Sequence, residues 1–453
     1  MPIPLTASAT DRLRGGLRGT LVLSTDAAYS TARRVWNGRI DRRPAAIARC
    51  ADAADVVACV RFARAHDLPL AVRGGGHAVA GLAVCDGGLV VDLSGLKSVR
   101  VDAHARVARA EPGATLADLD RATQAFGLAT PAGTDSEVGI AGLTLGGGNG
   151  WLMGAYGATV DNLLSADVVT ADGRRVTASA QVNEDLFWAL RGGGGNFGIV
   201  TSFEYRLHTV GPQVMAGAIL YPFANARDVL HAFRAFTHDA PDALTVFACL
   251  IRDADGVPVV CMAACHAGPL EVAVREVRPL RSLGPVLQDN LQPRPFVEWQ
   301  SFLDAARPAG RGCAMRSHFL DRLDEGFVAA LVAQFEAAPS PLSVAIVEHC
   351  HGAIARVAPQ ATAFAARTSP FHFEAIAFWE RPAEAAANLA WCDAFFAATR
   401  PFSSGRVYVN SLDAGEGDRL AEAYGPNLPR LRAIKREWDA TNLFRGNHNI
   451  EPA

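Results

Sequence analysis

A histidine directly after three glycines is the first feature of this sequence that could do chemistry. The stretch reads VRGGGHAVAG, residues 72–81, and it ends an apolar run. Glycines lack a Cβ, so the N–H groups of Gly74, Gly75 and Gly76 can converge on an anionic group. Arg73 is placed to brace this loop. We therefore expect an anion-binding turn, directly followed by His77.

Two further glycine-rich loops argue against a purely structural role for the first one. They read GIAGLTLGGGNGW (residues 139–151) and GGGGNFG (residues 192–198). The second formally contains G-x-G-x-x-G, but a helical pattern precedes it and a strand follows it. A nicotinamide-binding Rossmann turn needs the opposite order. Three such loops instead favour a diphosphate held by backbone amides outside Rossmann geometry.

Clusters of cysteine and histidine raise the question of a metal site. CMAACH (residues 261–266) and EHCHG (residues 348–352) both lie in strand-like segments. Alternation along a strand would send His349 and His351 to one face and Cys350 to the other. We therefore predict no metal site. The nine cysteines are odd in number and widely scattered, which favours reduced thiols.

The elements that must position these residues fall into two parts. Strands and helices alternate from residue 45, with an amphipathic helix over 115–127, a hairpin turning at Asp172-Gly173 and a helix begun by Asn183 as N-cap. After about residue 208 the glycine clusters end. Alternating segments such as LTVFACLI, LSVAIVEHC and FHFEAIAFW then predict an antiparallel sheet with Ala-rich helices on one face.

Composition limits the class of protein. The chain has 453 residues, too many for one compact core, and half of them are hydrophobic. Lys and Arg (43) nearly balance Asp and Glu (46), so no basic surface for nucleic acid is indicated. Neither a signal-peptide core nor an apolar run of membrane length is present. We expect a soluble, cytoplasmic protein that binds no nucleic acid and no membrane; its oligomeric state is not readable.

Taken in order, these motifs resemble the berberine-bridge-enzyme-like branch of the vanillyl-alcohol-oxidase flavoprotein superfamily. The matching stretches include WNGRIDRRPAAIARC, PLAVRGGGH, AGLTLGGGNGWL, NEDLFWALRGGGGNFGIVTSFEYRL and RVYVNSLD. They cover most of residues 36–208 and 406–452. The resemblance implies an α+β fold with a discontinuous FAD-binding domain (26–207 and 401–453) and a substrate domain (208–400) of antiparallel sheet covered by helices.

The resemblance also implies roles in binding FAD. His77 stands where the family bonds the flavin covalently through a histidine ring. Asp135 replaces the cysteine that forms a second tether in many relatives, so single attachment is expected. Val138 resembles the form that admits oxygen. The residues predicted to bind FAD are Arg73, Gly74, Gly75, Gly76, His77, Gly81, Asp135, Val138, Gly139, Gly142, Gly146, Gly198, Ile199, Val200, Asn447 and Asn449.

Glu374 falls where berberine bridge enzymes place a glutamate base. On a strand, His372 and Glu374 point to the same face, so the two could form a proton relay. Burial beside a flavin should raise the pKa of the glutamate. The alternative is that Glu374 pairs with an arginine such as Arg367 while His372 fills space. By resemblance Tyr408, on an expected strand VYVN, lies near the flavin ring and helps activate a substrate hydroxyl.

The function these residues indicate is an FAD-dependent oxidase. It would take a hydride from a C–H next to oxygen or nitrogen of a small organic substrate and reduce O2 to H2O2. Phe371, Phe373, Phe378 and Trp379 favour an apolar or aromatic substrate. Two alternatives stay open: a dehydrogenase that uses another acceptor, and a catalytically silent ligand-binding flavoprotein.

Overall fold

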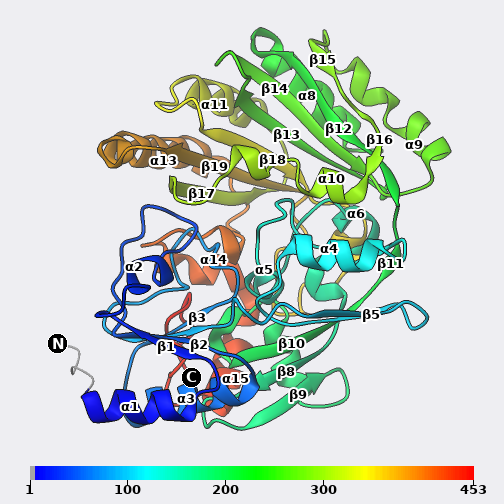
Figure 1. Ribbon diagram of the computed structural model, residues 1–453. Coiled ribbons are helices and arrows are strands. Elements are labelled where there is room, and N and C mark those ends of the chain that lie inside the picture. Colours follow the sequence, from blue (N-terminus) through cyan, green and yellow to red (C-terminus); the bar gives the residue numbers. More distant parts are fainter. Residues whose placement is uncertain (1–5) are drawn as a thin grey trace.

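The structure, a computed structural model, describes residues 6–453 as two parts that lie against each other (Figure 1). The first part begins with a four-stranded sheet in the order β1-β2-β4-β3. Its strands are β1 (Thr20–Leu23), β2 (Ala46–Arg49), β4 (Leu89–Asp92) and β3 (Leu70–Arg73). β3 and β2 both pair in parallel with β4. The helices α1 (Ala7–Gly16) and α3 (Ala53–Ala65) contribute to the core of this sheet.

A five-stranded antiparallel sheet completes the first part, in the order β5-β6-β10-β8-β9. Its strands are β5 (Val99–Asp102), β6 (Val107–Ala110), β10 (Ile199–Arg206), β8 (Leu163–Val169) and β9 (Arg175–Ser179). The accompanying helices are α4 (Leu116–Gln124), α5 (Ile140–Gly146), α7 (Glu184–Leu190) and α15 (Leu428–Trp438). Because α15 packs against α7, the end of the chain returns to the part that its beginning built.

The second part is one large antiparallel sheet in the order β15-β12-β14-β13-β18-β19-β17. Its long strands are β12 (Gln213–Pro222), β14 (Pro258–His266), β13 (Leu244–Arg252), β18 (Val344–His349), β19 (Phe371–Trp379) and β17 (Gly312–Leu320), and the short strands β15 (Gln288–Asp289) and β16 (Gln292–Pro295) pair with β12. The helices α8 (Ala226–Phe236), α11 (Glu325–Glu336) and α13 (Ala385–Thr399) cover its outer face (Figure 1). The other face turns toward the first part.

Most elements expected from the sequence form where the pattern placed them, with four differences. VYVN is not a strand: Tyr408 precedes a 3-10 turn, Val409–Ser411. Asn183 stands at the start of α7, but its side chain donates to the Thr177 carbonyl instead of capping the helix. The strand β17 was not anticipated. In addition, β1 joins the first sheet although it lies upstream of residue 26, where the FAD-binding domain was expected to begin.

Within the described residues, no helix combines the length and the apolar character needed to cross a membrane. The expectation that the N-terminus carries no signal-peptide core rests partly on residues 1–5, which lie outside the described part. All nine cysteines are free thiols.

A buried ion pair fixes the C-terminal segment. Lys435 on α15 and Asp439 are both fully buried and lie 2.7 Å apart (Nζ to Oδ2). Lys435 Nζ also donates to the carbonyl of Asn196, within the third glycine loop. Asp439 in turn accepts from the backbone N–H groups of Leu443 and Phe444. The pair therefore ties the last residues of the chain to a glycine loop.

We predict that Lys435→Ala lowers the free energy of unfolding by about 3–5 kcal/mol, because it leaves the Asp439 carboxylate buried without its partner. Denaturant unfolding of the purified protein measures this loss. Arg436→Ala is the matched control, since Arg436 is the next residue on α15, is exposed, and should change stability by less than about 0.5 kcal/mol. Equal stability of the two variants would contradict the prediction.

Candidate active site

A cavity of about 340 Å³ lies where the glycine loops meet the inner face of the large sheet. Its walls come from segments far apart in the sequence. Of the predicted residues, those that line it are Gly74, Gly75, Gly76, His77, Asp135, Val138, Gly139, Gly142, Gly198, Ile199, Val200, His372, Glu374, Tyr408 and Asn447. The cavity therefore brings together most of the residues that the sequence singled out.

The first two glycine loops touch each other backbone to backbone. A Cβ built on Gly75 would lie 2.6 Å from the backbone N of Gly139, and one built on Gly139 would lie 2.5 Å from the N of Gly75. Real Cβ atoms do not approach this closely, so both positions require glycine. A Cβ on Gly142 would meet nothing within 4 Å. These loops thus pack tightly on each other and leave open space on the cavity side.

Several polar atoms at the cavity have no partner among the described residues. Among them are Nε2 of His77 and both amide atoms of Asn149, all buried. Burial, together with the charge of Arg307, lowers the pKa of His77 to about 4, so its ring is neutral at pH 7. The indole of Trp36 stacks on this ring with centroids 4.2 Å apart. Orphaned donors and acceptors beside a glycine cradle fit a polar, diphosphate-bearing cofactor such as FAD.

Four predicted residues do not line the cavity, and their surroundings show what they do. Arg73 is buried behind the loop, where it donates to the Ala32 carbonyl and faces Asp92. Gly81 has φ +69°, and a Cβ there would lie 2.7 Å from Ile40.

The other two residues outside the cavity wall, Gly146 and Asn449, lie near or in the C-terminal segment. A Cβ on Gly146 would meet the side chain of Asn410 at 2.1 Å, so this glycine makes room for Asn410. The side-chain oxygen of Asn449 is buried without a partner among the described residues. Neither contributes to the cavity wall.

Arg307 lies close enough to Asp135, His77 and Glu374 for its charge to act on the pKa of each. Burial raises the pKa of Asp135 to about 6, although the charge of Arg307 opposes this. The guanidinium of Arg307 forms no ion pair with a carboxylate of residues 6–453, and it lines the cavity. No motif in the sequence marks Arg307, because it stands in an irregular segment between α10 (Phe296–Gln300) and β17.

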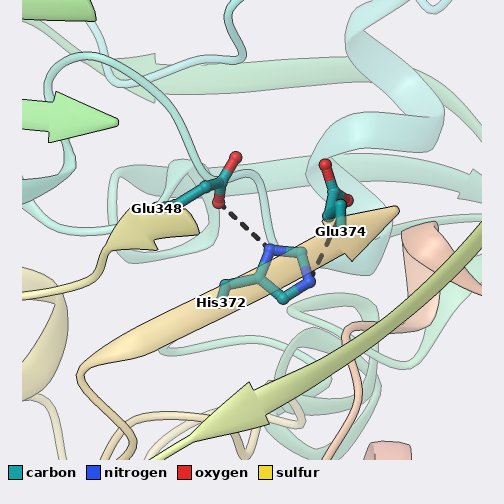
Figure 2. A group of neighbouring side chains, drawn as sticks. All are labelled: Glu348, His372 and Glu374. Carbon is teal, nitrogen blue, oxygen red and sulfur yellow. Dashed lines mark hydrogen bonds and ion pairs between the residues drawn. The ribbon is translucent and has the colours of Figure 1, made fainter. Parts of the chain in front are cut away.

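A second group of polar side chains comes from neighbouring strands of the large sheet (Figure 2). In the antiparallel register of β18 and β19, Glu348 stands directly opposite His372. Nδ1 of His372 lies 3.1 Å from Oε2 of Glu348, and Nε2 lies 3.9 Å from Oε1 of Glu374. As expected from strand alternation, His372 and Glu374 share the cavity face. Glu348 was missed, although it is the one charged residue in the apolar run LSVAIVEHC.

The electrostatics of this group follow from its burial. Burial raises the pKa of Glu374, and the charge of Glu348 raises it further. The charge of His372 and the hydrogen bond from Ser411 Oγ (2.6 Å) lower it, but the net result is a raised pKa. Burial alone would lower the pKa of His372, but the hydrogen bond to Glu348 and the charges of Glu374 and Glu348 raise it above its ordinary value.

The alternative that Glu374 pairs with Arg367 is wrong. Arg367 is fully buried and forms two 2.7 Å hydrogen bonds with the carboxylate of Asp161 in the first part of the molecule. Within the described residues, Glu374 has no arginine or lysine partner. Its carboxyl group is therefore available to a ligand in the cavity.

Tyr408 reaches the cavity from the C-terminal segment. Its hydroxyl oxygen accepts from the backbone N–H of Gly148 (2.7 Å) and from the side-chain amide of Asn410 (2.8 Å). Burial raises the pKa of Tyr408, so the phenol is protonated at pH 7. With both contacts directed at its oxygen, the hydroxyl hydrogen is free to donate to a ligand.

The group of Glu348, His372 and Glu374 suits proton transfer better than metal binding. Their donor atoms lie within 4.8 Å of one another. However, the two carboxylates approach opposite nitrogens of the imidazole (Figure 2). The lone pairs of these nitrogens diverge in the ring plane, so one ion could not use the imidazole and both carboxylates together. His349 and His351 lie elsewhere, with their rings stacked 4.1 Å apart.

The apolar part of the cavity differs from the expectation. Of the four aromatic residues on β19 that were taken to favour an aromatic substrate, only Phe378 lines it. Phe371, Phe373 and Trp379 point to the opposite face, into the core beneath the helices. Strand alternation separates them, so β19 contributes only Phe378 to the aromatic lining, which also includes Trp36, Tyr408 and Tyr424.

Comparison with known proteins agrees with this geometry. A family model described as FAD binding domain matches residues 44–179, and one described as berberine and berberine like matches residues 407–451. The chain is 32% identical to (R)-6-hydroxynicotine oxidase of Paenarthrobacter nicotinovorans, covering 96% of this chain and 97% of the relative.

Solved structures give the same result. The crystal structure of 6-hydroxy-D-nicotine oxidase from Arthrobacter nicotinovorans superposes with a TM-score of 0.89 at 30% identity, covering 96% of this chain and 98% of that one. Xylooligosaccharide oxidase from Myceliophthora thermophila gives a TM-score of 0.88 at 25% identity, covering 99% and 100%. This two-part chain belongs to the berberine-like family of FAD-linked oxidoreductases.

Proposed function

We propose that this enzyme is an FAD-dependent oxidase that takes a hydride from a C–H bond adjacent to oxygen or nitrogen of a small organic substrate and passes the electrons to O2, forming H2O2. The observation that carries the proposal is the cavity. On one side it presents a glycine cradle and an orphaned histidine, and on the other the paired side chains of His372 and Glu374. A cofactor and a substrate would meet between these walls.

The names of the similar proteins support a C–H bond next to nitrogen as well as one next to oxygen. One is named as an oxidase of 6-hydroxynicotine and another as an oxidase of xylooligosaccharides. The former substrate carries nitrogen and the latter oxygen. The cavity of this chain, lined by apolar side chains and by the carboxylates of Asp135, Glu348 and Glu374, is compatible with either.

The residues of the chain supply binding and proton transfer. FAD, when bound, supplies the hydride acceptor. Glu374 accepts the proton from the O–H or N–H group of the substrate as the adjacent C–H bond breaks. Tyr408 donates a hydrogen bond to the same heteroatom and thereby orients it. The neighbours of Glu374 on β19 are buried, and only 12% of the Glu374 side chain is exposed.

Oxygen is the proposed electron acceptor because of Val138. This side chain lines the cavity three residues after Asp135. Valine is short enough to leave space beside it, whereas a longer aliphatic side chain would fill that space. The dehydrogenase alternative predicts that reduced enzyme persists in aerated buffer.

We propose in addition that His77 bonds FAD covalently through its ring. We predict that acid precipitation of the purified protein leaves the yellow colour in the pellet, and that His77→Ala releases it into the supernatant. The matched control is His448→Ala, because His448 also lines the cavity and its loss should leave the colour in the pellet. Wild-type protein that releases its flavin in acid would contradict covalent attachment.

We predict that Glu374→Gln lowers turnover by about 10²–10⁴-fold while FAD stays bound, because a general base is lost. A panel of alcohols, sugars and amines scored by peroxide release provides the substrate. Wild-type kcat/KM should fall as pH drops through the raised pKa of Glu374, above its ordinary 4.5, since the protonated carboxyl cannot accept a proton. Glu380→Gln, at an exposed position just beyond β19, is the control. Unchanged turnover in Glu374→Gln would remove it from the mechanism.

We predict that Val138→Leu slows reoxidation of the reduced enzyme by O2, because the added methylene fills space in the cavity. Stopped-flow absorbance after mixing with aerated buffer measures the rate. Val182→Leu makes the same substitution at a site that is 50% exposed and should reoxidise like the wild type. A wild-type enzyme that is not reoxidised on mixing would favour the dehydrogenase.

A further inference from the structure

Within the described part of the chain, the carboxylate of Glu348 has a single charged partner, the imidazole of His372. Both side chains are largely buried: 12% of the Glu348 side chain and 1% of the His372 side chain are exposed. No lysine or arginine of residues 6–453 forms an ion pair with Glu348. A charge buried in this way needs a counter-charge or a strong hydrogen bond, and only His372 provides one.

The contact with Glu348 decides which nitrogen of His372 carries its hydrogen. A carboxylate only accepts hydrogen bonds, so the 3.1 Å contact requires a hydrogen on Nδ1. In the neutral ring Nε2 is then the lone-pair nitrogen. Nε2 is buried, makes no hydrogen bond among the described residues, and faces Glu374 at 3.9 Å (Figure 2). A shift of about 1 Å would bring the two atoms into hydrogen-bond contact.

We propose that Glu348 is a positioning residue that holds His372 in the Nδ1–H tautomer, so that Nε2 shares the proton that Glu374 accepts from the substrate. This inference rests on the proposed function and adds a residue to it. The substrate O–H or N–H bond breaks, the proton passes to the carboxylate of Glu374, and it is then shared with the lone pair of Nε2. The carboxylate of Glu348 balances the resulting imidazolium, and no electrons move in this step.

The arrangement of strands makes this relay rigid. Glu348 and His372 are a direct cross-strand pair of β18 and β19, and the ring of Phe319 on β17 packs against His372 with centroids 4.7 Å apart. The other ionisable groups near His372 and Glu374 are Tyr408, Arg307, His318, Cys249 and Cys350. None of these five makes a hydrogen bond to either ring nitrogen of His372.

The test follows His372 directly in the flavin-loaded enzyme, by NMR of protein labelled with ¹³C at Cε1 and ¹⁵N in the ring of histidine. The His372 signal is the one lost in His372→Gln. In the wild type the ring nitrogens should report the Nδ1–H tautomer at high pH. In Glu348→Gln we expect the His372 ring to be a mixture of tautomers. Its affinity for a proton should fall at least about 10-fold, which is one pKa unit.

The matched control is Glu276→Gln. His266, which is buried, and Glu276, which is half-buried, form another histidine–glutamate pair, 2.8 Å apart (Nε2 to Oε2), away from the cavity. This variant should move the His266 signal and leave the His372 signal unchanged. If Glu348→Gln leaves the tautomer and titration of His372 unchanged, the proposal is overturned. A stoichiometric metal ion found in the wild type and lost from Glu348→Gln would overturn it as well.

Turnover supplies an independent readout. With a substrate from the panel, Glu348→Gln should lower kcat about 10-fold, change KM little, and retain its full flavin content. Loss of flavin instead would indicate a structural role and contradict the proposal. Unchanged turnover in Glu374→Gln overturns the proposed base, whereas an unchanged His372 signal in Glu348→Gln overturns the role of Glu348, so the two failures are distinguishable.

Discussion

The close approach of two side-chain-free loops is the constraint on which the site depends. Gly75 and Gly139 meet backbone to backbone, at distances that exclude a Cβ on either residue. This contact joins the turn that carries His77 to the start of α5, beside Asp135 and Val138. The cavity floor therefore exists only because residues 64 positions apart in the chain both lack side chains.

The opposite wall depends on buried charges that hold the large sheet against the first part. Arg367, just before β19, is bound through two hydrogen bonds to Asp161. Asp413, in the C-terminal segment, pairs with Arg39 and also accepts from the backbone N–H of Met315 on β17. Such pairs cost desolvation and are strongly destabilising to break. They place Glu374 and His372 across the cavity from His77.

Much of the fold could be predicted because its signals are local. The helix expected over residues 115–127 forms over Leu116–Gln124, and Gly127, with φ +65°, lies just beyond its end. Alternation placed His372 and Glu374 on one face of β19. Other features depend on distant partners. Tyr408 was expected on a strand, but its hydroxyl is held by Gly148 and Asn410, and its backbone enters a 3-10 turn. Likewise, the partner of Arg367 is Asp161, 206 positions away in the chain.

The sequence by itself determined the glycine loops, the histidine beside them and the pair on β19, because periodicity and the absence of side chains are properties of short segments. Only the tertiary structure decided that Glu348 faces His372, since strand register is set by the whole sheet. It also decided that three of the four β19 aromatics belong to the core, because which face of a strand is buried beneath helices depends on how the sheet packs.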